Sequence, residues 1–180
     1  MKGIALALMT CVALIALGAS ASAILRQPTN QNDVLFGDAA PNTIHGKGGM
    51  DLINGLGAND TLYGDSGDDY IDGDYKERDS EFGVWGNDSL YGGKGSDWLE
   101  GNDGDDMLSG SVGRDVLDGG PGNDTLRGGA GHDVLNGDAG DDTISARDGT
   151  RDTITCGSGI DTVTADAKDR VVPGCETVAR

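Results

Sequence analysis

The chain has 180 residues with 32 glycines and only 4% aromatic residues, and its formal net charge at pH 7 is −18. This composition excludes an ordinary aromatic-rich core. Such an acidic surface repels nucleic acid and anionic membranes and attracts cations, so no nucleic-acid partner is expected. High acidity with few aromatic residues is common in disordered chains, but a strict sequence period runs through this chain and indicates that its charge is organised.

Residues 1–23 have the pattern of an export signal. A positive start at Lys2 precedes an apolar run over residues 4–17, and small residues follow that run. The run is short for a membrane span, so we expect a cleavable signal peptide, a secreted protein and no transmembrane anchor. The alternatives are an uncleaved anchor and a lipoprotein modified at Cys11, which the apolar residues beyond this cysteine disfavour. Residues 24–31 form a short lead-in.

A nine-residue period runs through residues 32–146. Aspartate recurs at this spacing, with Asn42 filling one early gap, and a branched aliphatic residue follows two positions later every time. The aspartates are Asp33, Asp51, Asp60, Asp69, Asp88, Asp97, Asp106, Asp115, Asp124, Asp133 and Asp142. A period repeated this often indicates a solenoid built from equivalent units.

Each unit predicts a turn followed by a very short strand. In the unit at residues 92–100, GGKGSDWLE, the glycine-rich part suits the positive φ angles of a tight turn, and the last three residues alternate between two faces. A strand this short is not stable alone, so it must stack on equivalents from other units. Two units then form one coil of an all-β fold, a right-handed two-sheeted parallel β-roll with coils about 4.8 Å apart.

Counting two units per coil sorts the turn residues into two stacks. The first is predicted to hold Asp33, Asp51, Asp69, Asp88, Asp106, Asp124 and Asp142, and the second Asn42, Asp60, Asp97, Asp115 and Asp133. Carboxylates stacked at this spacing repel by about 3 kcal/mol per adjacent pair at an effective dielectric near 20, so a cation has to lie between them. The turns offer only oxygen ligands, which favour calcium over zinc, copper or magnesium. We therefore predict several bound Ca²⁺ ions and a largely unfolded chain without them.

These repeats resemble the RTX, or haemolysin-type, calcium-binding nonapeptide GGxGxDxUx, in which U is a large aliphatic residue. The resemblance covers residues 32–164, and the unit at residues 92–100 is a clean copy. It implies a calcium-binding β-roll whose ligands are turn carbonyls and the repeat carboxylates. The metal ligands expected on this basis are the eleven aspartates of the nine-residue period, with weaker ligation by Asn42, Asp152 and Asp161.

Three departures from the repeat predict weaker places. Residues 73–82 form a degenerate repeat that is one residue too long, with Glu81 in the aliphatic position, so we expect a bulged coil and a doubtful site at Asp79. The turn at residues 37–42 lacks two glycines and the carboxylate, which weakens the first site. Residues 147–180 contain degenerate repeats and are expected to cap the open end of the roll.

Two cysteines, Cys156 and Cys175, remain after the expected signal peptide. In an oxidising compartment we expect them to form a disulfide that closes the C-terminal cap, contributing about 3 kcal/mol in the chain-entropy account. Two free thiols, or a metal-binding pair without histidine partners, are the alternatives.

The sequence offers no catalytic constellation. Both histidines, His45 and His132, stand at variable repeat positions, and no GxSxG or HExxH motif occurs, so we do not expect an enzyme. EF-hand loops are absent because the acidic turns lack a twelfth-position glutamate. A threonine row for ice binding is disfavoured, because the predicted row with Thr125 also contains Tyr70 and Met107.

The aromatic residues cluster in one part of the sequence. Seven of the eight lie between positions 63 and 98: Tyr63, Tyr70, Tyr75, Phe82, Trp85, Tyr91 and Trp98. They either form a contact patch for a glycan or protein partner, or occupy outward strand positions and cover the irregular coil. The sequence thus predicts a secreted, monomeric calcium-binding β-roll that acts as a structural, matrix or surface module, with calcium-dependent adhesion or glycan/protein binding as the alternative.

Overall fold

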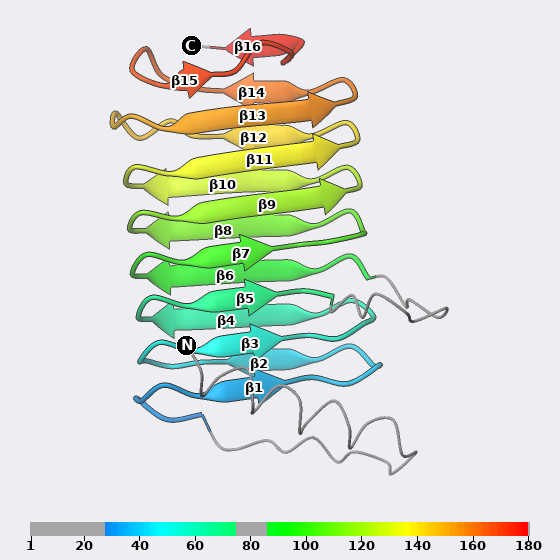
Figure 1. The fold of residues 1–180 in the computed structure, drawn as a ribbon, viewed down its shortest axis with the longest axis vertical. Helices are drawn as coiled ribbons and strands as arrows, with labels where there is room; N and C mark the ends of the chain where they lie inside the picture. Colours follow the sequence, from blue (N-terminus) through cyan, green and yellow to red (C-terminus); the bar gives the residue numbers. More distant parts are fainter. Residues whose placement is uncertain (1–27, 75–85, 180) are drawn as a thin grey trace, which may run out of the picture.

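The structure is a computed structural model that describes residues 28–74 and 86–179. These residues form sixteen strands and no helix, and the strands belong to two eight-stranded parallel sheets. Successive strands alternate between the sheets, so each coil contributes one strand to each sheet and the coils stack along one axis (Figure 1). The predicted two-sheeted parallel β-roll is confirmed. No helix long and apolar enough to cross a membrane occurs in the described ranges.

The two sheets divide the strands by odd and even number. The odd-numbered sheet contains β1 (Val34–Phe36), β3 (Leu52–Asn54), β5 (Tyr70–Asp72), β7 (Trp98–Glu100), β9 (Val116–Pro121), β11 (Val134–Ala139), β13 (Thr153–Ser158) and β15 (Arg170–Val171). The even-numbered sheet contains β2 (Thr43–His45), β4 (Thr61–Ser66), β6 (Ser89–Lys94), β8 (Met107–Val112), β10 (Thr125–Ala130), β12 (Thr143–Ser145), β14 (Thr162–Thr164) and β16 (Thr177–Ala179).

The core is a double column of aliphatic side chains between the sheets. In β1 to β14 the second residue of each strand points inward, because alternate residues of a strand face opposite sides. These residues pair in register, as Leu99 does with Leu117, and each is at most 5% exposed. They are Leu35, Ile44, Ile53, Leu62, Ile71, Leu90, Leu99, Leu108, Leu117, Leu126, Leu135, Ile144, Ile154 and Val163.

The first residue of each strand lies on the outer face, and the two sheets differ strongly there. On the odd-numbered sheet these residues form an apolar row of Val34, Leu52, Tyr70, Trp98, Val116 and Val134, paired in register. On the even-numbered sheet they form a hydroxyl row of Thr43, Thr61, Ser89, Met107, Thr125, Thr143, Thr162 and Thr177. The mixed row expected from the sequence is therefore wrong, and each outer face is chemically uniform over most of its length.

The error comes from the irregular segment at residues 73–82. Asp60 and Asp88 are in adjacent coils although 28 residues separate them, whereas regular neighbours such as Asp88 and Asp106 are 18 residues apart. Gly73 and Gly86 keep the places of the first and fourth residues of one turn, so the extra residues stand between them in the sequence. The described coils on both sides are regular, and the predicted register is wrong there, while the expected bulged coil falls on residues 75–85, outside the described residues. Asp79 and Glu81 lie outside the described residues.

The C-terminal residues continue the roll. Strand β15 pairs with β13, and β16 pairs with β14, which adds one more coil above the last regular repeat. The predicted disulfide joins Cys156 in β13 to Cys175 shortly before β16, with the two Cα atoms 5.4 Å apart. This bond ties the last coil to the one beneath it, and the free-thiol and metal-pair alternatives are ruled out.

Candidate metal centre

The repeat aspartates form two ladders of hydrogen bonds along the roll. In each ladder the backbone N–H of one turn residue donates to Oδ1 of the aspartate one coil further on, as Asp97 does to Asp115 over 2.9 Å. One ladder contains Asp33, Asp51, Asp69, Asp97, Asp115, Asp133, Asp152 and Asp169. The other contains Asn42, Asp60, Asp88, Asp106, Asp124, Asp142, Asp161 and Glu176. Membership differs from the stacks predicted, because the insertion exchanges the two edges after Asp69.

The second carboxylate oxygen of the interior aspartates is buried without a hydrogen-bond partner among the described residues. Every one of these side chains is at most 3% exposed. They are Asp51, Asp60, Asp69, Asp88, Asp97, Asp106, Asp115, Asp124, Asp133, Asp142, Asp152 and Asp161. A buried ionised oxygen without a partner is strongly unfavourable, so its repetition in turn after turn points to a missing positive charge.

Burial also changes the acidity of these groups. Loss of hydration raises the pKa of Asp60 to about 7 and that of Asp106 to about 8, and neighbouring carboxylates add to the rise. The same causes raise the pKa of Asp115 and Asp124 to about 7. The hydrogen bond from the preceding turn opposes this rise in each case without cancelling it. The turns therefore hold their negative charge at a cost that a cation would remove.

The first glycine of each turn makes room around the unpartnered oxygen. A Cβ atom on Gly101 would lie 2.5 Å from Oδ2 of Asp106 and 2.6 Å from the carbonyl oxygen of Gly119, in the next coil. The same arrangement occurs at Gly64, near Asp69 and Gly92. A carboxylate oxygen and a carbonyl oxygen from two coils thus converge on a space that any side chain would fill.

The second and fourth glycines have a different role. Gly93 and Gly95 have φ angles of 109° and 138°, which side-chain-bearing residues rarely adopt. A Cβ atom on Gly95 would also lie 1.7 Å from the carbonyl oxygen of Gly67 in the preceding coil. These glycines therefore set the turn conformation and the close spacing of the coils.

The donor set fits a hard cation. The converging atoms are carboxylate and carbonyl oxygens, the ligands that calcium prefers, and the coils supply them from flexible turns. Among the described residues, no group of three or more His, Cys, Asp or Glu side chains is placed to hold one ion. Each regular turn supplies one buried carboxylate, so backbone carbonyls must provide much of any coordination shell.

The ends of the first ladder differ from its interior. Oδ2 of Asp33 accepts hydrogen bonds from the backbone N–H and the hydroxyl of Thr29, over 2.6 and 2.9 Å. At the other end, Oδ2 of Asp169 accepts one from the backbone N–H of Asp166 over 2.7 Å. The chain itself therefore satisfies these terminal carboxylates. Asp33 therefore differs from the interior aspartates, and its role as a metal ligand stays a prediction.

The second ladder begins with the amide of Asn42. Its Oδ1 accepts a hydrogen bond of 2.7 Å from the backbone N–H of Asp38, so it closes its own turn. In contrast, Asp152 and Asp161, predicted to be weaker ligands, have the same buried and unpartnered Oδ2 as the regular repeats. Their turns are irregular in sequence, but their position in the ladders is equivalent.

Two acidic ladder members escaped the sequence analysis. Asp169 and Glu176 accept the last N–H of each ladder, from Asp152 over 3.1 Å and from Asp161 over 2.9 Å. Their spacing is shorter than nine-residue repeats allow, which hid them. The signal that could have found them is an acidic residue with an aliphatic one two positions later, as in Asp169 followed by Val171.

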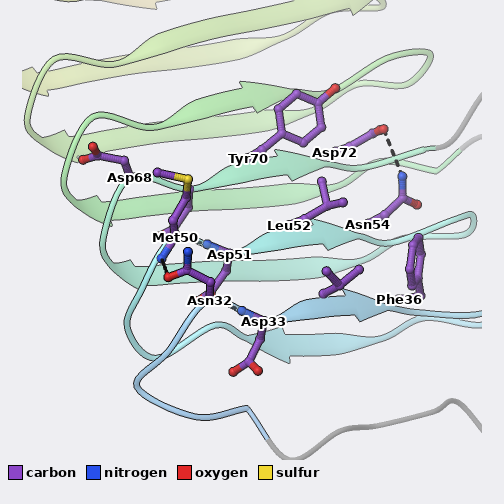
Figure 2. Close-up of a pocket in the computed structure, with 12 residues that line it drawn as sticks. Asn32, Asp33, Phe36, Met50, Asp51, Leu52, Asn54, Asp68, Tyr70 and Asp72 are labelled. Atoms are coloured by element: carbon purple, nitrogen blue, oxygen red, sulfur yellow. Dashed lines mark hydrogen bonds between the residues drawn. The ribbon is translucent and has the colours of Figure 1, made fainter. Parts of the chain in front are cut away.

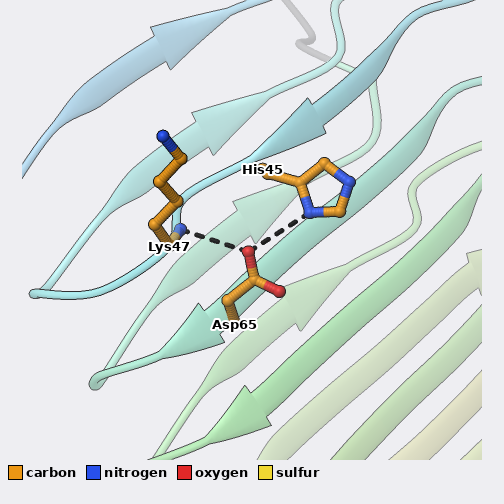
Figure 3. A network of polar contacts seen from close by, with 3 residues as sticks. All are labelled: His45, Lys47 and Asp65. Atoms are coloured by element: carbon orange, nitrogen blue, oxygen red, sulfur yellow. Dashed lines mark hydrogen bonds and ion pairs between the residues drawn. The ribbon is translucent and has the colours of Figure 1, made fainter. Parts of the chain in front are cut away.

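The described aromatic residues do not form one patch. On the even-numbered sheet, His45, Tyr63 and Tyr91 stack as a ladder with ring centroids 4.3 and 4.9 Å apart. Nδ1 of His45 lies 3.2 Å from Oδ2 of Asp65, and that oxygen also accepts the backbone N–H of Lys47 (Figure 3). This network holds the histidine ring in place and gives it a structural role.

Tyr70 and Trp98 lie on the outer face of the odd-numbered sheet, with ring centroids 6.3 Å apart. The four described aromatics of the 63–98 cluster thus occupy outward strand positions on two opposite faces, as one of the two interpretations predicted. Tyr75, Phe82 and Trp85 lie outside the described residues.

The comparison with known protein families agrees with this geometry. The family of RTX calcium-binding nonapeptide repeats matches four stretches, residues 29–57, 45–74, 82–117 and 118–151, which together span well over half of the chain. No curated protein matches the chain. The family match falls on the same repeats that form the aspartate ladders and the glycine-lined turns. The chain therefore belongs to the RTX calcium-binding nonapeptide repeat family.

Proposed function

We propose that this protein is a secreted structural module whose stacked aspartates bind several calcium ions, and that this binding stabilises the folded roll. The observation that carries the proposal is the row of buried Oδ2 atoms without hydrogen-bond partners in the described turns. Calcium would supply the positive charge that these oxygens lack. It also accepts many oxygen ligands in a flexible geometry. Folding and metal binding would then be coupled, since the unfolded chain has no preformed site.

The residues of each turn have distinct roles in this function. Oδ1 of an aspartate such as Asp106 fixes the side chain through the N–H of Asp88, 2.7 Å away. Oδ2 is thereby directed toward the space beside Gly101, where the Gly119 carbonyl oxygen also points. The twelve interior aspartates are the proposed ligands, and Asn42, Asp33 and the C-terminal ladder ends are boundary residues.

Calcium titration followed by far-ultraviolet circular dichroism tests this function. We expect strand signal to appear cooperatively with added calcium and to disappear with a chelator, while magnesium at equal concentration has little effect. Equilibrium dialysis with radioactive calcium would count the ions bound per chain. A strand signal that is unchanged by the chelator would refute metal-coupled folding.

Calcium-dependent adhesion through the aromatic cluster is the second candidate function. Tyr63 has one ring stacked on each side, His45 and Tyr91, so its faces are not open to a sugar ring. Trp98 is 48% exposed and remains the best aromatic anchor on the described surface. Retention of a partner by wild type but not by Trp98→Ala would support this function, whereas equal retention would remove its basis.

A further inference from the structure

The apolar row of the odd-numbered sheet is an unusual surface for so acidic a protein. Its six residues follow one another on adjacent strands, from Val34 to Val134, and none of them is buried. Five strand spacings of about 4.8 Å make the row about 24 Å long. A continuous exposed apolar row on a rigid sheet is typical of an interaction surface. The hydroxyl row on the opposite sheet offers no comparable surface.

A second row, of hydrogen-bond acceptors, runs beside the apolar row on the same face. Asp72, Glu100 and Asp118 lie in register on β5, β7 and β9, two residues along the strand from the apolar row. The only ion pair in the described part of the chain is between His45 and Asp65, so these three carboxylates have no cationic partner there. Their contacts are with amides and a hydroxyl, such as Tyr70 Oη donating to Glu100 over 2.7 Å.

A hollow lies near the N-terminal end of the sheet, where Val34, Leu52 and Tyr70 of the apolar row and Asp72 of the carboxylate row line it. Its volume is about 640 Å³, and its walls include Leu52, Tyr70, Asn54 and Asp72 (Figure 2). The Nδ2 atom of Asn54 donates to Asp72 over 2.9 Å, which fixes the orientation of the amide. Oδ1 of Asn54 is then buried without a hydrogen-bond partner among the described residues. The hollow thus presents apolar surface next to polar side chains that the chain itself holds in place, since both oxygens of Asp72 accept hydrogen bonds from Asn54 and Asn102.

We propose that this face binds a cationic amphipathic helix of a partner protein, lying along the roll axis. The apolar row would receive the apolar stripe of the helix, and the partly exposed carboxylates of Glu100 and Asp118 would pair with lysine or arginine side chains beside that stripe. At a rise of 1.5 Å per residue, a helix of about 16 residues matches the length of the row.

Charge selects this occupant over a second copy of the chain. Two copies would face each other with the same carboxylate row and the same net charge of −18, so their association through this face is opposed by repulsion. A basic helix meets complementary charge instead, and its donors can pair with Glu100 and Asp118. The inference rests on the folded, calcium-bound roll of the proposed function and adds a partner to it.

Fluorescence anisotropy with a labelled peptide tests the proposal on the calcium-loaded full chain. The probe is a helix of about 16 leucines and lysines with its leucines on one face. Two control peptides are a scrambled leucine–lysine sequence without an apolar face and a leucine–glutamate helix with the same pattern. At about 0.15 M salt, where long-range attraction is screened, we expect the probe to bind at least tenfold more tightly than either control.

Matched variants locate the binding face. The double variant Trp98→Thr/Val116→Thr removes apolar surface while keeping β-branched residues on the strands, and Glu100→Gln removes one charge. We expect each to weaken probe binding at least fivefold, whereas Met107→Thr on the opposite sheet should leave it unchanged. Calcium titration of the same variants separates a lost docking face from a lost fold, and Glu100→Gln remains a test if the double variant does not fold.

Three results would overturn the proposal. Equal binding of the probe and the scrambled peptide would mean that the net charge of the peptide alone explains its binding. Unchanged probe binding by the face variants would place the contact elsewhere. A wild-type dimer in sedimentation experiments that Trp98→Thr/Val116→Thr abolishes would make a second copy the occupant. None of these results alters the calcium titration, so docking can fail while the calcium-binding function stands.

Discussion

Oδ1 of Asp106 accepts a hydrogen bond of 2.7 Å from the backbone N–H of Asp88, while Oδ2 of the same carboxylate is buried and has no such partner within residues 28–74 and 86–179. The two oxygens of one side chain therefore serve different purposes. The first holds neighbouring coils in register, and the second is directed at the proposed cation site. This division repeats along both edges of the roll. Substitutions can therefore test each role separately.

Asp106→Asn should separate the two roles. The amide can keep the oxygen that accepts the N–H of Asp88 but loses the charge on the second oxygen. We expect calcium to bind the affected site at least tenfold more weakly, or about 1.4 kcal/mol. Isothermal titration calorimetry measures this change. Asp138→Asn makes the same charge change at an exposed turn position and should leave the affinity unaltered.

Gly101→Ala should damage the cation site through crowding. Its Cβ atom would lie 2.5 Å from Oδ2 of Asp106, so either the carboxylate or the neighbouring coil must move. Overpacking of this kind costs about 1 to 3 kcal/mol, which urea unfolding in saturating calcium would detect. Gly48→Ala is the matched control, because its Cβ would meet nothing closer than 3.4 Å. Equal effects of both substitutions would contradict the proposed crowding.

The calcium-free protein should lose stability as the pH rises. Burial raises the pKa of Asp60 to about 7 and that of Asp106 to about 8 from the usual 3.8, so the folded state binds more protons than the unfolded state between these values. Stability therefore falls as the pH rises through the range from about 4 to 8. Far-ultraviolet circular dichroism in chelator at several pH values would show this trend as strand signal that grows on acidification, and strand signal that grows as the pH rises would contradict it.

Calcium affinity should follow the opposite trend. Binding requires ionised carboxylates, so the ions displace protons from groups such as Asp115 and Asp124, whose pKa values burial raises to about 7. We expect affinity to increase between about pH 5 and pH 8. Calorimetry in buffers of different ionisation enthalpy would measure the protons released. Release of no protons near pH 6 would contradict the raised pKa values.

Removal of the disulfide should loosen the last coil. Cys156 and Cys175 are separated by 19 residues, and closing a loop of this size contributes about 3 kcal/mol in the chain-entropy account. In Cys156→Ser/Cys175→Ser we expect faster amide hydrogen exchange in β15 and β16 and little change in β7 to β9. Uniform protection across all strands would show that packing alone holds the cap.

Shortening the insertion tests the corrected register. Replacement of residues 75–85 by one glycine would convert the segment between Asp74 and Gly86 into a turn of regular length. We expect the variant to retain its strand signal and its calcium-dependent folding, because the coils on both sides are already regular. The register that treats residues 73–82 as a repeat predicts a disrupted roll instead. A misfolded variant would favour that register.

The regular part of the fold was predictable because it depends on local rules. An aspartate with an aliphatic residue two positions later predicts a turn and an inward-facing side chain in any repeat, as at Asp97 and Leu99. The disulfide followed from the number of cysteines left after the expected signal peptide. The ladder positions of Asp152 and Asp161 were less evident, because their turns differ in sequence although the backbone returns to the same positions.

Repetition and composition in the sequence determine the parallel roll, its aliphatic core and the oxygen-rich turns, since each nonapeptide encodes its own turn and strand. The assignment of each residue to an edge or a face came from the folded coils. Whether the irregular segment is a repeat or an insertion is decided by the strand pairing on both sides of it. Here Tyr70 pairs with Trp98, and Thr61 pairs with Ser89. That pairing is a long-range contact, and it alone assembled the apolar row, the carboxylate row and the two aspartate ladders.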